Sequence, residues 1–144
     1  MQSAELHAPD AADAAGAPDT AGAPDTADAP GAAPAVVPAD ALRIGSGRTL
    51  KFEGRPYGSG ISYFLVDNDP GQGPDLHRHP YPETWVVLEG EARITIGDEQ
   101  LIATAGDTAT VTAGVWHGFK NSGTARLRIM CIHASDVMVQ ENLE

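Results

Sequence analysis

Short segments in which apolar and polar residues alternate fill the chain from about residue 49 onwards. Alternation with a period of two residues is typical of β-strands, and no stretch before Ser135 keeps the 3.6-residue apolar period of a helix. Gly, Pro, Asp and Asn separate these segments, as turns between strands require. The pattern predicts about eight strands, over residues 49–53, 61–66, 84–88, 91–96, 100–104, 108–112, 115–120 and 126–133.

Short strands at this regular spacing predict an all-β domain, either an antiparallel sandwich or a small barrel. Residues 84–88 are apolar on both faces, as expected of a strand in the interior of such a domain. After the last strand, residues 137–143 predict one short terminal helix. We assign the β domain to residues 41–144.

The first 40 residues have a different composition from the rest. They contain 15 Ala, 6 Pro and 7 acidic residues, but no Lys, Arg or aromatic residue. The prolines prevent a long helix, and so few large apolar side chains cannot offset the entropy lost on ordering. We therefore interpret residues 1–40 as a disordered acidic tail that keeps the protein in solution.

Charge and cysteine content exclude several classes of function. The 144 residues carry a formal net charge of -11, with 9 basic against 20 acidic side chains, which argues against binding nucleic acid or an anionic membrane. Cys131 is the single cysteine, which excludes an internal disulfide and a four-cysteine zinc site. The chain shows neither an apolar run that could span a bilayer nor a secretory signal, which predicts a cytoplasmic protein.

Three histidines and one glutamate of the β domain carry the candidate chemistry. On a strand, His77 and His79 share a face while Arg78 points the opposite way. Glu83 begins the next strand, and His117 follows 34 residues later on another. Three imidazoles and one carboxylate suit a divalent transition metal, namely Fe, Mn, Ni, Co, Cu or Zn. Four protein ligands on a six-coordinate ion leave two positions for water or substrate, as in a catalytic site.

These residues fall in two motifs that resemble those of the cupin family. Residues 71–90 read Gly-x5-His-x-His-x3-Glu-x6-Gly and match the first cupin motif at every fixed position. Residues 106–121 read Gly-x5-Thr-x-Gly-x2-His-x3-Asn and match the second, except that Thr112 replaces the usual proline. The resemblance covers residues 49–133. It implies a double-stranded β-helix, the cupin or jelly-roll barrel, with the metal ligands His77, His79, Glu83 and His117.

Strand parity selects candidate substrate-binding residues. Trp85 and Val87 share the parity of Glu83, and Phe119 shares that of His117, so we expect these three side chains to line the substrate pocket. Packing in the hydrophobic core is the alternative for each aromatic ring.

Two further residues are candidate proton carriers. His133 shares an otherwise apolar strand face with Cys131, where it is either a catalytic acid/base or a core histidine with satisfied hydrogen bonds. Tyr63 is the second candidate, although Tyr63 and Phe64 cannot both face inward. We interpret Cys131 as a small buried apolar residue rather than a reactive thiol.

Three functions fit such a site. The resemblance places an iron(II) dioxygenase acting on a small chelating substrate first. A redox-neutral isomerase, lyase or cyclase using Zn, Mn or Ni is the second, and it requires a proton carrier. A non-catalytic module that binds a small chelating ligand is the third. We predict one divalent metal per chain, iron(II) before Mn, Ni, Zn or Co, and, because cupins commonly dimerise, a homodimer.

Overall fold

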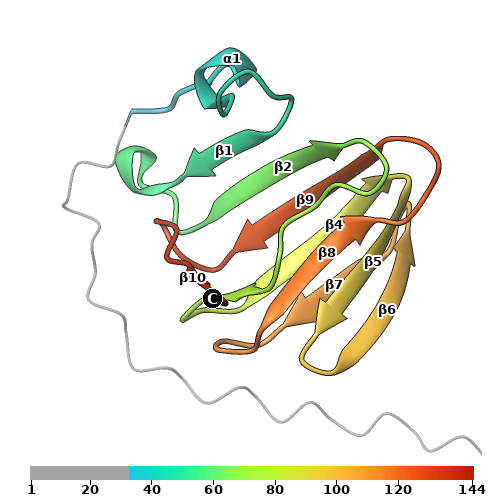
Figure 1. Cartoon of the computed structure of the whole chain (residues 1–144). Coiled ribbons are helices and arrows are strands. Elements are labelled where there is room, and N and C mark those ends of the chain that lie inside the picture. Colours follow the sequence, from blue (N-terminus) through green and yellow to red (C-terminus); the bar gives the residue numbers. More distant parts are fainter. Residues whose placement is uncertain (1–32) are drawn as a thin grey trace, which may run out of the picture. The chain divides into compact units, whose positions relative to one another are not determined.

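The computed structural model describes residues 33–144, which form two five-stranded sheets packed face to face (Figure 1). The first sheet has the order β1 (Leu50–Glu53), β2 (Ser62–Asn68), β9 (Leu127–His133), β4 (Glu83–Glu89) and β7 (Thr108–Val111). The second has the order β10 (Glu141–Asn142), β3 (His77–Arg78), β8 (His117–Asn121), β5 (Glu91–Ile96) and β6 (Glu99–Thr104). Outside the sheets are the short helix α1 (Ala39–Leu42) and the 3-10 turn η1 (Arg55–Tyr57).

This architecture confirms the predicted all-β jelly roll. Each of the eight predicted strands overlaps an observed one, and the two additional strands, β3 and β10, are two residues long. All strand pairs are antiparallel, as in a double-stranded β-helix. The predicted tail, residues 1–40, lies mostly outside the described residues, so the boundary at residue 41 stays a prediction.

Alternation along the strands directs one set of side chains into the space between the sheets. Along β9, every second residue from Leu127 to His133 is buried, while the residues between them are partly exposed. The apolar members of this set and their neighbours on β4, β5 and β8 form one core, and burying each large aliphatic side chain contributes about 1.5–3 kcal/mol.

Close packing at the end of β4 requires a glycine. Gly90 has a φ of +88°, and a Cβ atom there would collide with the carbonyl oxygen of Arg126. A residue with a side chain would therefore strain both the turn and the contact. The turn keeps β4 and β5 in different sheets, which places the interior between them.

The terminal helix predicted over residues 137–143 is wrong. This segment is extended and ends in β10, which pairs with β3. After Val137, its backbone N–H groups donate to distant residues: that of Met138 to Glu53 (2.9 Å) and that of Leu143 to the carbonyl of Leu76 (3.1 Å). Tertiary hydrogen bonds thus replace the local ones on which a helix depends.

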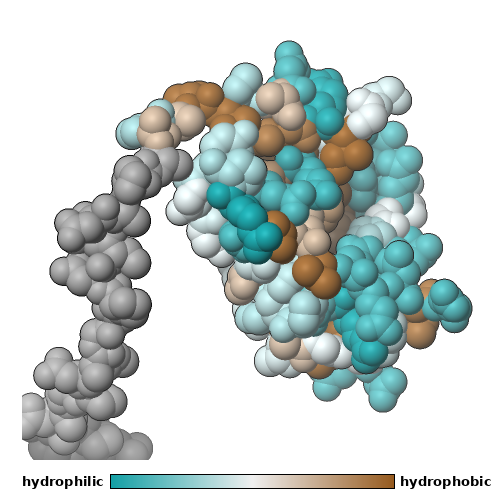
Figure 2. All heavy atoms as spheres, turned by 90° about the vertical axis from the view of Figure 1, so that its left-hand side faces the viewer, coloured by the Kyte–Doolittle hydropathy of each residue, from teal (hydrophilic) through white to brown (hydrophobic). Residues whose placement is uncertain are grey.

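The surface is mixed in character. On the side shown in Figure 2, hydrophobic residues lie in separate patches among hydrophilic ones. Among residues 33–144, no helix is long and apolar enough to cross a membrane.

Candidate metal centre

The four predicted ligands come together at one end of the barrel. His77 lies on β3 opposite His117, the first residue of β8, and Glu83 begins β4 on the other sheet. His79 follows β3 directly. All four side chains are buried, and their ligand atoms all lie within 4.8 Å of one another.

Backbone carbonyls orient the three imidazoles. Each ring places Nδ1 against a carbonyl oxygen: His77 against Asp75 (2.7 Å), His117 against Val115 (2.8 Å) and His79 against Val139 (2.7 Å). Because a carbonyl only accepts hydrogen bonds, Nδ1 must carry the proton in each ring. Each Nε2 atom is then left to act as a metal ligand.

Glu83 lies among the imidazoles. Its Oε2 is 2.8 Å from Nε2 of His117 and 3.1 Å from Nε2 of His79, and its Oε1 is 3.3 Å from Nε2 of His133. Burial raises the pKa of Glu83, but the contacts with His117, His133 and His79 together hold it well below its usual range. Burial also lowers the pKa of His77. Both shifts favour the forms that bind metal, a carboxylate and a neutral imidazole.

This donor set fits a divalent transition metal. Although Glu83 Oε2 lies 3.1 Å away, the buried Nε2 of His79 makes no hydrogen bond among the described residues, as expected of a lone pair directed at an ion. Three imidazole nitrogens and one carboxylate oxygen are the donors that such metals accept, and the carbonyl contacts supply the orientation that ligating histidines require.

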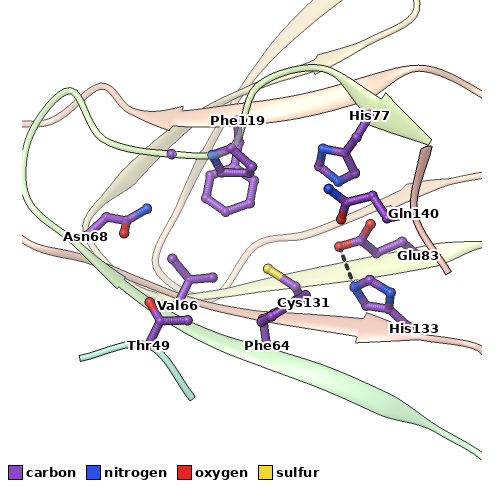
Figure 3. A pocket seen from close by; sticks show the side chains of 12 residues that line it. Thr49, Phe64, Val66, Asn68, His77, Glu83, Phe119, Cys131, His133 and Gln140 are labelled. Atoms are coloured by element: carbon purple, nitrogen blue, oxygen red, sulfur yellow. Dashed lines mark ion pairs between the residues drawn. The ribbon is translucent and has the colours of Figure 1, made fainter. Parts of the chain in front are cut away.

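His133 is adjacent to the four ligands and contacts Glu83 (Figure 3). Its Nδ1 is 2.8 Å from the hydroxyl of Tyr81, which also accepts the Val139 N–H at 3.0 Å. The Tyr81 hydroxyl can therefore donate to Nδ1, which leaves the proton of His133 on Nε2, 3.3 Å from Glu83 and without a hydrogen-bond partner among the described residues. His133 is thus placed both to position a ligand and to face the cavity.

A cavity of about 410 Å³ opens beside the four ligands. Figure 3 shows its wall, with His77, Glu83 and His133 at one end and Asn68 and Thr49 at the other. Between these ends lie the residues Phe64, Val66, Phe119 and Cys131, with Gly73, Pro74 and Gln140 completing the lining.

Two residues of the lining have special surroundings. Gly73 has a positive φ (154°), and a Cβ atom there would collide with the carbonyl of Phe119, so this position requires a glycine. Burial raises the pKa of the Cys131 thiol well above its usual range, so the thiol stays neutral.

The structure separates the predicted pocket residues into two groups. Phe119 lines the cavity, whereas Trp85 and Val87 lie deeper in the core and do not. Trp85 packs edge-on against His117, with ring centroids 5.3 Å apart. Parity correctly directs all three side chains inward, but the cavity runs along β2 and β9, and of β4 only Glu83 lines it.

Tyr63 is not brought to the site. Its ring stacks on Phe52 at 5.1 Å, on the outer side of the first sheet, because its neighbour Phe64 takes the inward position. Phe64 pairs in register with Cys131, and both line the cavity.

Tyr81 and Gln140 are site residues that sequence reasoning missed. Tyr81 stacks on His79 with a centroid distance of 5.0 Å and an interplanar angle of 6°. An aromatic residue between two prolines, inside the segment that joins two ligands, was a signal for its role. Gln140 offers no such signal, because it comes after the last predicted strand.

Comparison with known proteins agrees with this geometry. The family model of the Cupin domain matches residues 64–133. Mannose-1-phosphate guanylyltransferase 2 of Escherichia coli O157:H7 is 26% identical over 94 residues, which cover 65% of this chain and 20% of that protein. Xanthan biosynthesis protein XanB of Xanthomonas campestris is 29% identical over 75 residues, 51% of this chain and 16% of that protein. The chain thus spans a fifth or less of these relatives.

Solved structures show the same fold. Oxalate decarboxylase of Bacillus subtilis, described with Mn(II) centres, is 24% identical with a TM-score of 0.63, over 71% of this chain and 29% of that one. An oxalate oxidase is 20% identical with a TM-score of 0.59, over 66% of this chain and 54% of that one.

Proposed function

Since the chain belongs to the cupin family, we propose that it is a metal-dependent enzyme, an iron(II) dioxygenase acting on a small substrate that chelates the metal. The observation that carries this proposal is the convergence of three oriented Nε2 atoms and the Glu83 carboxylate beside a cavity with apolar walls. A metal held there supplies a Lewis acid and, as iron(II), electrons for the reduction of O2.

The cavity lining supports a particular class of substrate. Among the described residues that line it, none is Lys or Arg, so the protein provides no cation for a phosphate or a second carboxylate. Phe64, Val66 and Phe119 offer apolar contact instead. We infer a substrate with one chelating group, such as a phenol, an enol, a thiol or a single carboxylate, on a largely apolar body.

The residues of the chain have distinct tasks in this reaction. The apolar wall formed by Phe64, Val66 and Phe119 excludes water from the substrate and strengthens polar contacts at the ligand end. At the opposite end, Asn68 and Thr49 offer hydrogen bonds to a polar substituent. His133 lines the cavity 3.3 Å from Glu83, and its Nε2, which has no hydrogen-bond partner among the described residues, can exchange a proton with a substrate group.

Oxygen consumption tests the proposal. Protein loaded anaerobically with Fe²⁺ is mixed with oxygen and a panel of catechols, enols, thiols and monocarboxylates of about the cavity's size. We expect stoichiometric O2 uptake with at least one substrate, and none by Glu83→Gln at equal protein concentration. Uptake at the background rate across the whole panel, with Fe²⁺ bound, would exclude the dioxygenase.

A redox-neutral isomerase, lyase or cyclase is the second candidate. The observation that favours it is the buried chain from Tyr81 through His133 to Glu83, which can deliver a proton at the edge of the cavity. Such an enzyme would convert its substrate without oxygen when loaded with Zn²⁺, Mn²⁺ or Ni²⁺, and His133→Ala would lose that turnover. Anaerobic turnover therefore separates the two candidates.

Other expectations from the sequence stay predictions. They are the small-molecule substrate, the absence of nucleic-acid and membrane partners, the cytoplasmic location and the homodimer. Sedimentation of the full chain tests the last of these, and a single species of 15.0 kDa would contradict it.

A further inference from the structure

A segment outside the family match returns to the metal site. The match ends at residue 133, where β9 ends, yet residues 136–143 return to β3 and bring Gln140 to the cavity lining. We call residues 136–143 the C-terminal strap. Its last residues form β10, which pairs with β3, the strand that carries His77.

The strap contacts the site through Val139. The carbonyl of Val139 accepts the hydrogen bond from Nδ1 of His79 (2.7 Å), and its N–H donates to the hydroxyl of Tyr81 (3.0 Å). Of the three carbonyls that orient the imidazoles, this is the one distant in sequence: it lies 60 residues from its histidine, whereas the other two lie two residues away. The orientation of His79 therefore depends on the position of the strap. Gln140, the next residue, lines the cavity.

Ion pairs anchor the strap at both ends. Arg55 makes two hydrogen bonds to Asp136, at 3.0 and 3.1 Å. Arg78 makes two to Glu141, at 2.9 and 3.0 Å. All four side chains are exposed, so each ion pair contributes little by itself. Backbone hydrogen bonds, from the Arg55 N–H to the Asp136 carbonyl (3.0 Å) and from the Leu143 N–H to the Leu76 carbonyl (3.1 Å), hold the strap as well.

We propose that the C-terminal strap is a positioning element that sets how tightly the site holds its metal, by orienting His79 through the Val139 carbonyl. The inference rests on the proposed metal dependence of the site. Groups that orient a ligating histidine typically change metal affinity by about 10–100-fold when they are lost. Release of the strap frees the His79 ring to rotate while the other ligands keep their local carbonyl partners.

Charge reversal at one anchor tests the proposal. Glu141→Arg places two guanidinium groups side by side and should loosen the strap where β10 pairs with β3, while the double variant Arg78→Glu/Glu141→Arg should restore the pair. Asp40→Arg is the matched control, because it makes the same charge change beside Arg43, in an exposed ion pair of α1. A chain ending at Ser135 removes the strap entirely. Thermal unfolding establishes that each variant is folded.

Two measurements are made on each protein. Amide hydrogen exchange of Val139 and Leu143 reports whether the strap is attached, and the electron paramagnetic resonance signal of free Mn²⁺ gives the dissociation constant. We expect Glu141→Arg to exchange faster and to bind Mn²⁺ about tenfold more weakly, the chain ending at Ser135 to bind at least as weakly, and the double variant and Asp40→Arg to resemble the wild type.

The possible failures are distinguishable. Mn²⁺ affinity within about twofold of wild type in the chain ending at Ser135, or in any variant whose strap amides exchange freely, would overturn the role of the strap. Weaker binding by Asp40→Arg would overturn it as well, since the effect would then follow from net charge. If the wild type itself bound neither Mn²⁺ nor Fe²⁺, the proposed function would fail instead.

Discussion

Two rows of inward-facing side chains run side by side on β4 and β9, and the two ends of these rows differ in chemistry. From the ligand end inward, the facing pairs are Glu83 with His133, Trp85 with Cys131, and Val87 with Ile129. The same strand faces thus change from charged to apolar within about four residues. All six side chains are buried, so the difference lies in chemistry and not in exposure.

The side chains at one end of the barrel therefore stabilise the fold, and those at the other end are placed to bind metal. At the apolar end, burial itself contributes free energy to folding. At the polar end, buried groups need partners to offset the loss of hydration, and carbonyls, Tyr81 and neighbouring ligands supply them. Substitutions at the apolar end should change the free energy of unfolding, and substitutions at the polar end should change metal binding.

Ile129→Ala should produce the largest effect. Ile129 is fully buried in the core cluster, and removing its branched side chain should lower the free energy of unfolding by about 2–5 kcal/mol. Urea denaturation measures this loss. The fraction that stays folded should bind Mn²⁺ with unchanged affinity, and a large loss of affinity would contradict the separation of the two ends.

Glu83→Gln should have the opposite profile. The amide keeps the size of the side chain but not its charge, so we expect Mn²⁺ affinity to fall at least about a hundredfold, equivalent to about 2.7 kcal/mol. Urea unfolding without metal should change less than in Ile129→Ala, since the amide keeps the volume of the side chain and can donate a hydrogen bond to an unprotonated Nε2 atom. If Glu83→Gln unfolded as readily as Ile129→Ala, the polar end would be structural after all.

Tyr81→Phe tests whether the Tyr81 hydroxyl contributes both to stability and to metal binding at the polar end. The variant keeps the ring that stacks on His79 but removes the hydroxyl that joins Val139 to His133. Leaving these groups unpaired should cost about 1–3 kcal/mol of stability and weaken Mn²⁺ binding by about tenfold or less. Calorimetry and metal titration measure the two effects, and a change in stability alone would show that His133 does not position Glu83.

The smallest effect belongs to Asp67, far from the ligands. Hydrogen bonds from Arg126 and then from Arg48 lower the pKa of Asp67. Since its folded pKa lies below the unfolded value of about 4, this stabilisation is fully present above that pH and is lost as the pH falls below it. Asp67→Asn should cost at most about 1 kcal/mol at neutral pH, because the pair is at the surface. Its stability should also decline less steeply between about pH 4 and 2.

Asp40→Asn is the control for this prediction, because Asp40 pairs with Arg43 but is exposed. Denaturation curves collected across the acidic range for both variants make the comparison. A steeper acid loss in Asp67→Asn than in the wild type would contradict the sign argued above.

Strand parity in the sequence predicts which side chains face the interior of the barrel. It directs His77, His79, Glu83, His117 and Phe119 inward, because the period of a strand is set by local backbone geometry. It cannot predict which inward side chains reach the cavity: Trp85 has the parity of Glu83 and lies opposite Cys131, yet only Cys131 lines the cavity, because the order of strands in the sheets decides where the cavity runs.

The conformation and the contacts of the C-terminal strap could not be predicted from the sequence. Val139 and Leu143 are four residues apart, like neighbours on one face of a helix, yet their segment is held by distant partners. Local periodicity cannot predict that the carbonyl of Val139 accepts a hydrogen bond from His79, which lies 60 residues away in the sequence. The prediction that Tyr63 lies at the site is wrong for a related reason. Either Tyr63 or Phe64 could face inward, and the pairing of β2 with β9 determines which one does.

The ligands also have a mechanical consequence, because they come from both sheets. His77 and His117 belong to the second sheet, whereas Glu83 begins a strand of the first. In polymer terms, an ion bound by all of them is a reversible cross-link that closes a loop between residues 77 and 117 and clamps the two layers together. Because such a clamp exists only in the folded chain, heat resistance should rise with the concentration of free metal and fall when a chelator is added.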